Sequence, residues 1–352
     1  MHSKRRRQMS SVEAAYEKLV TRFLTDGCEE KQKSSIRRYR YDIELFRDWS
    51  EERNLSLQEA MTNDHADAFF LYLCTEKKYS TPTIRRILSV LKQLYIFHFG
   101  SNLTTPFDRH LNSQEVEHKK EASDFMKKKE IEKLLMTVPS RKGLSDHQLT
   151  HRHFYIERNQ AIIHLMLFYG LSIQEVTGLT MNHVHFQTGV IELKSRKGKP
   201  RSVTLTDEDR VLLHHYYQKI PEPVRPRWHS SDPLFAAFDF QRGTYRWNYD
   251  DDAPKRLTDV SVQKMIRQEI SRAGLRKGMS ARSFRHTYIL HRLLEGRSAE
   301  ELKYELAFVT AQPLEPYENF ILSSPDEAAV FTPMTKKERE EITRLITQPA
   351  RR

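Results

Sequence analysis

The segment from Ser280 to Phe320 restricts the fold more than any other part of the chain, because it combines an amphipathic helix with clustered cationic side chains and a tyrosine. On a helix, Arg282 and Arg285 are three residues apart and project from the same end. Such a helix can hold a phosphate diester on paired guanidinium groups, while the phenol of Tyr317 approaches from a later loop. The apolar stripe that would bury the opposite side consists of Phe284, Ile289 and Leu293.

The excess of positive charge points to a polyanionic partner. The chain has 352 residues, with 58 Lys and Arg against 47 Asp and Glu, and its formal net charge at pH 7 is +11. Nucleic acid phosphates favour such a surface, because Lys and Arg contacts release condensed counterions. Nucleic acid is therefore the expected partner, and the length is sufficient for two domains.

Cysteine usage and hydropathy indicate the compartment. Cys28 and Cys74 are too few for a disulfide framework or a zinc site, which fits a reducing interior. The basic N-terminus is not followed by the apolar core of a signal peptide, and no apolar run approaches the length of a membrane span. Histidines cluster at 147–153 and 183–185 without carboxylates or cysteines at metal-ligand spacing. We therefore expect a cytoplasmic protein that binds neither a metal nor a membrane.

The first hundred residues predict a helical module with basic outer faces. A basic arm at 1–10 is followed by four apolar patterns of helical period within 11–100. The cations that lie off these apolar stripes are Arg37, Arg38, Arg40, Arg85, Arg86 and Lys92. They are candidates for phosphate contacts, and the alternative is that they provide only solubilising charge. Residues 101–123 lack a periodic pattern and predict an extended linker.

The rest of the chain predicts a mixed domain at 124–322 and a tail at 323–352. Alternating segments at 190–193 and 202–205 predict a β-hairpin with an exposed, strongly basic turn. Residues 221–256 form a polar and aromatic insertion with no predicted conformation. The other expected elements are helices at 125–138, 207–219, 258–273 and 334–346, a packed helix pair at 158–179, and a loop at 141–153. The last helix packs either on its own domain or on a neighbouring subunit, which would give a homo-oligomer on DNA.

Several segments of the second half follow one another in an order that resembles the tyrosine recombinase (phage integrase) family. These segments are Arg158–Ile162, Gly170–Leu171, Glu175–Val176, Leu179, Lys197–Arg201, Phe284–Tyr288, Leu294–Gly296, and Leu306 with Tyr317 eleven residues later. The helical module resembles the core-binding domain of that family. The resemblance implies a mainly α fold with a small antiparallel β-sheet, in which a core-binding domain and a mixed α/β catalytic-type domain form a clamp around double-stranded DNA.

Active members of this family cut DNA without a metal or nucleotide cofactor. A tyrosine attacks a backbone phosphate, forms a 3′-phosphotyrosine and frees a 5′-hydroxyl, while two arginines neutralise the phosphate and a lysine on the hairpin turn protonates the leaving oxygen. By resemblance, Tyr317 occupies the position of the nucleophile and Arg285 that of the second arginine. Lys197 is the expected lysine, with Lys194 or Lys199 as alternatives. The expected DNA contacts of this domain are Lys197, Lys199, Arg201, Arg282, Arg285 and His286.

Three positions depart from the family pattern. Ser172 stands where the first arginine is expected, Arg282 replaces a histidine, and Phe308 replaces a His or Trp. Serine lacks the reach, charge and fork geometry of arginine, and phenylalanine donates no hydrogen bond. Loss of one preorganised donor typically slows phosphoryl transfer by about a hundred- to a thousandfold.

These departures leave three hypotheses. The first is a sequence-specific DNA-binding protein with a degenerate, inactive site that acts as a regulator, such as a phage or mobile-element repressor. The second is a working recombinase or integrase that cleaves through Tyr317 and uses Arg282 in place of the missing arginine. The third is an accessory protein that binds DNA by its shape.

Overall fold

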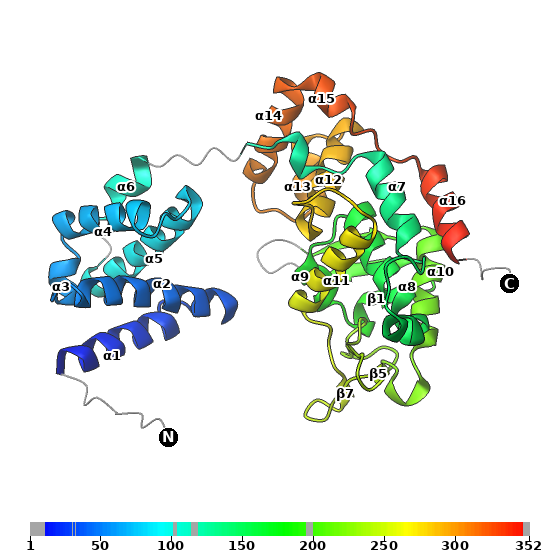
Figure 1. Ribbon diagram of the computed structural model, residues 1–352, viewed down its shortest axis with the longest axis horizontal. Helices are drawn as coiled ribbons and strands as arrows, with labels where there is room; N and C mark the ends of the chain where they lie inside the picture. Colours follow the sequence, from blue (N-terminus) through cyan, green and yellow to red (C-terminus); the bar gives the residue numbers. More distant parts are fainter. Residues whose placement is uncertain are drawn as a thin grey trace. The chain divides into compact units, whose positions relative to one another are not determined.

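The computed structural model describes residues 11–29, 31, 33–100, 104–113, 119–194 and 200–347. The chain divides into two compact units, residues 1–117 and residues 118–352 (Figure 1). No helix among these described residues is long and apolar enough to cross a membrane. The predicted basic arm and residues 195–199 of the basic turn lie outside the described residues.

The first unit is helical, as predicted, and its described helices close around an aromatic core. The extended linker predicted over 101–123 is wrong at Asp108–Ser113, which forms a helix whose Asp108 carboxylate accepts from the Thr105 N–H at 2.7 Å. They are α1 (Ser11–Thr25), α2 (Lys33–Glu51), α3 (Leu57–Ala60), α4 (Asn63–Thr75), α5 (Thr81–Phe99) and α6 (Asp108–Ser113). Phe46 of α2 stacks on Trp49 with 5.8 Å between ring centroids, and it meets Phe69 of α4 edge-on at 4.9 Å. All three rings are buried, so they exclude water from the centre of the unit.

The second unit is built around the long helix α8, which packs against α10 and α12. The helix α16 lies beside α7 and α10 (Figure 1). The helices are η1 (Ala122–Asp124), α7 (Lys128–Thr137), α8 (Asp146–Phe168), α9 (Ile173–Gly178), η2 (Met181–His183), α10 (Asp207–Lys219), η3 (Glu222–Val224), α11 (Asp259–Arg272), α12 (Ala281–Leu294), α13 (Ala299–Glu305), η4 (Gln312–Leu314), α14 (Glu315–Ser323), α15 (Pro325–Ala329) and α16 (Lys336–Thr347). This mainly helical architecture with small antiparallel sheets confirms the predicted fold class.

The β-structure is limited to short antiparallel pairs. The strands β1 (Val184–His185), β2 (Val190–Leu193) and β3 (Arg201–Thr204) form one sheet in the order β1-β2-β3, which confirms the predicted hairpin. In its register, Val190 pairs with Thr204 and Leu193 with Arg201. The insertion at 221–256 contains two further pairs, β4 (Phe238–Asp239) with β5 (Thr244–Tyr245) and β6 (Trp247–Asn248) with β7 (Ala253–Pro254). These pairs lie at the end of the unit opposite to α14 and α15 (Figure 1).

The predicted loop at 141–153 is wrong beyond residue 145, because α8 begins at Asp146. Ser145 and Gln148 form a capping box, in which the Ser145 hydroxyl accepts from the Gln148 N–H at 3.3 Å and the Gln148 side chain accepts from the Ser145 N–H at 3.0 Å. The segment has no apolar stripe at its start because Arg152, a charged residue, is buried there against the Val138 carbonyl. Tertiary contacts therefore extend the helix by three turns beyond the apolar pattern.

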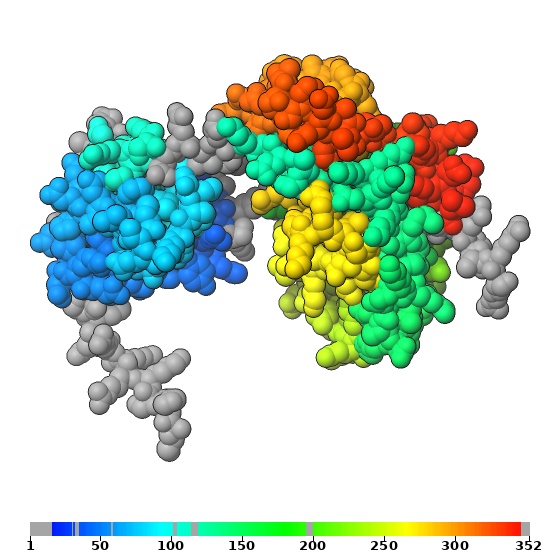
Figure 2. Space-filling view, turned by 45° about the horizontal axis from the view of Figure 1, so that its top comes forward, coloured from blue at the N-terminus to red at the C-terminus, as the bar shows by residue number. Residues whose placement is uncertain are grey.

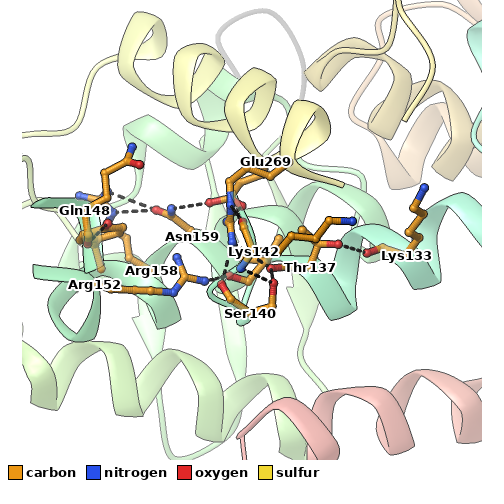
Figure 3. Close-up of polar contacts among 12 residues, drawn as sticks. Lys133, Thr137, Ser140, Lys142, Gln148, Arg152, Arg158, Asn159 and Glu269 are labelled. Atoms are coloured by element: carbon orange, nitrogen blue, oxygen red, sulfur yellow. Dashed lines mark hydrogen bonds and ion pairs between the residues drawn. The ribbon is translucent and has the colours of Figure 1, made fainter. Parts of the chain in front are cut away.

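A buried polar network joins the end of α7 to α8 and α11 (Figure 3). Glu269 of α11 accepts a hydrogen bond from Asn159 Nδ2 at 3.3 Å and pairs with Arg272. The Arg272 guanidinium also donates to the carbonyls of Lys142 at 2.8 Å and Ser140 at 2.7 Å. The outer surface of α11, in yellow, lies beside the green surface of α7 and the start of α8 in Figure 2. The network thus fixes the position of α11 on the unit.

Removal of the Glu269 carboxylate should destabilise the second unit strongly. In Glu269→Ala, the buried guanidinium groups of Arg272 and Arg152 lose their nearest counter-charge. We expect the free energy of unfolding in urea to fall by about 3–5 kcal/mol. The matched control is Gln268→Ala at the exposed neighbouring position, which should change it by less than about 0.5 kcal/mol. Equal stability of the two variants would contradict a structural role for this carboxylate.

Candidate active site

Tyr317 is held in a buried position on α14. Pro316 opens this short helix, and Phe320, one turn further on, packs into the same core as Leu314. The Tyr317 side chain is 4% exposed, and its ring lies 6.1 Å from that of Phe125. Its hydroxyl contacts Nδ1 of His286. The tyrosine is therefore placed by packing and aimed by one hydrogen bond.

His286 projects from α12, which forms as predicted over Ala281–Leu294. Ser280 caps this helix, with its hydroxyl accepting from the Arg282 N–H at 3.3 Å. Phe284 is buried on the inner side, whereas Arg282 is exposed and Arg285 and His286 are half-buried. The structure therefore brings Tyr317 to the basic end of α12, where the sequence had placed the phosphate-binding groups.

Arg285 is oriented by one acceptor just before α9 and one on α9 itself. Its Nη1 donates to the Gly170 carbonyl and, at 2.9 Å, to Oε2 of Glu175. Gly170 has a φ of 63°, and a Cβ at this position would collide with the ring of Tyr288, so only glycine fits. The second oxygen of the same carboxylate, Oε1, accepts from Arg201 Nε at 3.0 Å.

The Glu175 carboxylate is therefore shared by two guanidinium groups. Burial raises the pKa of Glu175, but the positive charges of Arg201 and Arg285 outweigh that effect and hold the pKa below its usual value. Arg201 also donates to the Glu305 carbonyl at 3.1 Å. Because Arg201 is buried and occupied in this way, it faces the interior, although the sequence had suggested a DNA contact at this position.

Ser172 has a local role at the position of the expected first arginine. Its hydroxyl accepts from the Glu175 N–H at 3.2 Å, and Glu175 Oε2 accepts from the Ser172 N–H at 2.7 Å. This reciprocal pair is the capping box of α9. Ser172 thus helps to fix the carboxylate that orients Arg285, and its own side chain is too short to replace a guanidinium.

The other two departures from the family pattern flank Arg285 and Tyr317. The ring of Phe308 lies 5.6 Å from the Arg285 guanidinium, in a cation–π arrangement that orients Arg285 without offering a hydrogen bond. Burial raises the pKa of Tyr317, and the charges of Arg285 and Arg282 oppose this shift without cancelling it. Both arginines are therefore close enough to stabilise negative charge at the phenol oxygen.

Lys120 completes the group, and sequence reasoning missed it. This residue falls within the predicted linker, yet its Nζ lies 3.2 Å from Nε2 of His286 and 5.2 Å from the centroid of the Tyr317 ring. Burial, and then the positive charge of Lys120, lower the pKa of His286 to about 4. No local pattern could have identified this lysine, because its contact with His286 joins residues 166 positions apart.

The remaining predicted DNA contacts differ in their availability. Arg37, Arg38 and Arg40 are exposed on α2. Arg86 pairs with Asp42, Lys92 pairs with Asp108, and Arg85 donates to the Leu111 carbonyl. Lys197 and Lys199 lie outside the described residues. Within the described part of the chain, no group of three or more His, Cys, Asp or Glu residues could hold a metal ion.

A helical unit followed by a mixed unit whose tyrosine faces a basic helix is the arrangement of a DNA recombinase of the tyrosine type. The family model "Phage integrase family" matches residues 124–312, more than half of the chain, and the phage integrase N-terminal SAM-like domain matches residues 16–100. The chain therefore belongs to the phage integrase family.

Curated relatives are similar to this chain in sequence, and solved structures share its fold. Tyrosine recombinase XerC of Halalkalibacterium halodurans is 25% identical over 289 residues, which cover 81% of this chain and 87% of that protein. Tyrosine recombinase XerD of Oceanobacillus iheyensis is 24% identical over 227 residues, 64% of this chain and 67% of that protein. The Tn1549 transposon integrase, solved with a circular intermediate DNA, aligns over 93% of this chain and 98% of its own with a TM-score of 0.61 and 17% identity. The XerH recombinase bound to its difH substrate aligns over 88% and 94% with a TM-score of 0.58 and 18% identity.

The depressed pKa of His286 predicts a loss of stability in mild acid. The unfolded chain takes up a proton on this histidine below about pH 6.5, whereas the folded protein does so only near pH 4. The free energy of unfolding should therefore fall as the pH decreases from about 6.5 to 4, and His286→Gln should reduce this fall by about 1–2 kcal/mol. Urea denaturation at a series of pH values measures this change in the free energy of unfolding. His215→Gln, at an exposed position, should keep the wild-type pH dependence.

Proposed function

We propose that the protein binds specific sites on double-stranded DNA and acts as a recombinase that breaks and rejoins strands through Tyr317. The observation that carries this proposal is the contact between the Tyr317 hydroxyl and His286, on the helix end that also bears Arg282 and Arg285. Tyr317 lies just beyond the segment matched by the family model, so its role rests on these contacts and on its position.

The proposed reaction needs one nucleophile and several cations. The Tyr317 oxygen attacks the phosphorus of a backbone phosphate and loses its proton, and the bond from phosphorus to the 5′-oxygen breaks. The 5′-oxygen takes a proton from the lysine of the hairpin turn, for which Lys197 is the candidate. Arg285 and Arg282 neutralise the charge that gathers on the non-bridging oxygens, and the reverse reaction rejoins the strand.

The relatives favour this activity over the inactive regulator that the sequence suggested first. Those named above are recombinases and an integrase, and the two solved structures are complexes with a circular intermediate DNA and with the difH substrate. By resemblance, Tyr317 and Arg285 match the family's nucleophile and second arginine, and the exposed side chain of Arg282 could turn toward a phosphate. Arg282 would then supply the positive charge that the family's first arginine normally supplies.

The cleavage-deficient regulator remains the second candidate, and Ser172 and Phe308 are the observations that favour it. Neither side chain can supply the charge or hydrogen bond expected at its position. If Arg282 does not reach the phosphate, the rate penalty is about a hundred- to a thousandfold, and the DNA-binding surface would be the part of the protein that still functions. A sequence-specific repressor would use that surface alone.

The C-terminal helix bears on the proposed homo-oligomer. In this structure α16 packs on its own unit, where Arg339 pairs with Asp209 and contacts the Tyr169 hydroxyl. Asp209 also accepts from Tyr169 at 2.6 Å and pairs with His164 at 2.7 Å. A homo-oligomer that forms on DNA through α16 would have to keep or replace the ion pair between Arg339 and Asp209. This homo-oligomer stays a prediction.

Covalent capture on DNA tests the proposed activity directly. The substrate is a nicked duplex from the neighbourhood of the gene, whose short fragment diffuses away after cleavage. We expect wild-type protein to form a covalent DNA adduct on denaturing gels, and Tyr317→Phe to form none while its DNA affinity is nearly unchanged. Tyr304→Phe, which alters a tyrosine that is 66% exposed, is the control and should behave as wild type. Specific binding without any adduct would favour the second candidate.

The proposal that Arg282 supplies the second guanidinium is tested by removing the arginine from residue 282 and then adding one at residue 172. Arg282→Ala should lower the rate of adduct formation by about a hundred- to a thousandfold with little loss of DNA affinity. Adding Ser172→Arg to that variant should restore much of the rate, although the lost helix cap costs about 1 kcal/mol of stability. Arg267→Ala, at an exposed position of α11, is the control for loss of one positive charge. If Arg282→Ala cleaves as fast as the control, Arg282 does not replace the missing arginine.

A further inference from the structure

We propose that Lys120 is a positioning residue for the nucleophile: it holds His286 in the tautomer that donates a hydrogen bond to the Tyr317 oxygen. This inference rests on the proposed function, because it concerns how the phenolate of Tyr317 is stabilised during cleavage. The juxtaposition that supports it is a chain of three groups, from Lys120 Nζ to His286 Nε2 and from His286 Nδ1 to the Tyr317 hydroxyl.

The lysine reaches this site from the start of the second unit. Its side chain is 16% exposed, and its Nζ lies 3.2 Å from His286 Nε2 and 3.8 Å from the Asp124 carboxylate. The same ammonium lies 5.2 Å from the centroid of the Tyr317 ring. Lys120 therefore touches both the histidine and the tyrosine, and the carboxylate that partly balances its charge lies on η1.

The hydrogen-bonding capacity of the Lys120 ammonium determines which groups donate and which accept between Lys120, His286 and Tyr317. A protonated lysine has three donors and no acceptor, so Lys120 donates to Nε2 of His286. A neutral imidazole carries its single proton on the other nitrogen, Nδ1. The ring is neutral at pH 7, because burial and the neighbouring charge of Lys120 lower the pKa of His286 to about 4. Nδ1 must then donate to the Tyr317 oxygen.

This direction has a chemical consequence for the nucleophile. A donor aimed at the Tyr317 oxygen favours the phenolate over the phenol, which opposes the effect of burial on that group. His286 is then no acceptor for the tyrosine proton. When the O–H bond of Tyr317 breaks, its proton passes to water or hydroxide, while the bond from oxygen to phosphorus forms and the 5′-oxygen leaves.

The ionisable groups around His286 come from three elements and from the segment that precedes one of them. Arg282 and Arg285 lie on α12, Asp124 on η1, Tyr317 on α14, and Lys120 precedes η1. Burial lowers the pKa of Lys120, Asp124 raises it, and Arg282 lowers it. Ser172 brings no charge, and Lys120 adds a cation from an unrelated segment beside His286 and Tyr317.

The test is the pH dependence of adduct formation on the nicked duplex described above. With Lys120→Met, the rate at pH 7 should fall at least about tenfold, and the rising limb of the pH profile should move upward by about one pH unit or more, so that the variant approaches the wild-type rate at high pH. Lys120→Arg, which also only donates, should recover most of the rate at pH 7.

Lys129→Met provides the matched control, since it removes the same charge from an exposed position on α7. Its pH profile should equal that of wild type, and its DNA affinity in a gel shift should resemble that of Lys120→Met. A loss of rate in Lys120→Met that is equal at every pH, or no loss at all, would overturn the positioning role.

The tautomer can also be observed without any cleavage. In protein labelled with ¹⁵N-histidine, NMR should show that His286 carries its proton on Nδ1 in wild type, and that Lys120→Met loses this preference. A proton on Nε2 in wild type would overturn the inference even if the adduct forms. If no adduct forms but the Nδ1 tautomer is present and depends on Lys120, the proposed recombinase activity fails and the inference about His286 stands.

Discussion

The Glu175 carboxylate is the interaction on which the geometry of the candidate site depends. One of its oxygens holds Arg201 of β3, and the other holds Arg285 of α12 and the Ser172 N–H that begins α9. Three elements that are far apart in sequence therefore meet at a single half-buried carboxylate. Desolvation makes such a group costly unless all its partners are present, so the carboxylate selects one arrangement of α9, β3 and α12.

If residue 172 is the position of the family's first arginine, as the resemblance implies, a serine there has a limited effect on the contacts of Glu175. Serine keeps the helix cap, and the backbone N–H at this position still holds Glu175. Arg285 remains oriented by Glu175 and by the Gly170 carbonyl. A serine at residue 172 brings no charge to a bound phosphate, but the contacts with Glu175 and Gly170 that orient Arg285 remain.

Sequence reasoning predicted the elements whose signals are local. The stripe of α12 and the hairpin of β2 and β3 follow from residue spacing. Tyr317 was matched to this site by the family resemblance, and it lies on α14 and not on the expected loop. It failed at the start of α8, where the buried Arg152 hides the apolar pattern. It also failed for Lys120, because a lysine in an aperiodic segment has no signal until the fold brings it to His286.

These failures share a physical cause that also affects how a degenerate site is recognised. A motif records which residue stands at a position, whereas a phosphate responds to the total charge and the donors within reach, whatever their place in the chain. In this site the motif positions have lost one arginine, but Arg282 and Lys120 add two cations that no position of the motif requires. On the function proposed above, counting substitutions underestimates the negative charge that these side chains could stabilise, and the protonation state of His286 between Lys120 and Tyr317 would decide whether the tyrosine can act as a nucleophile.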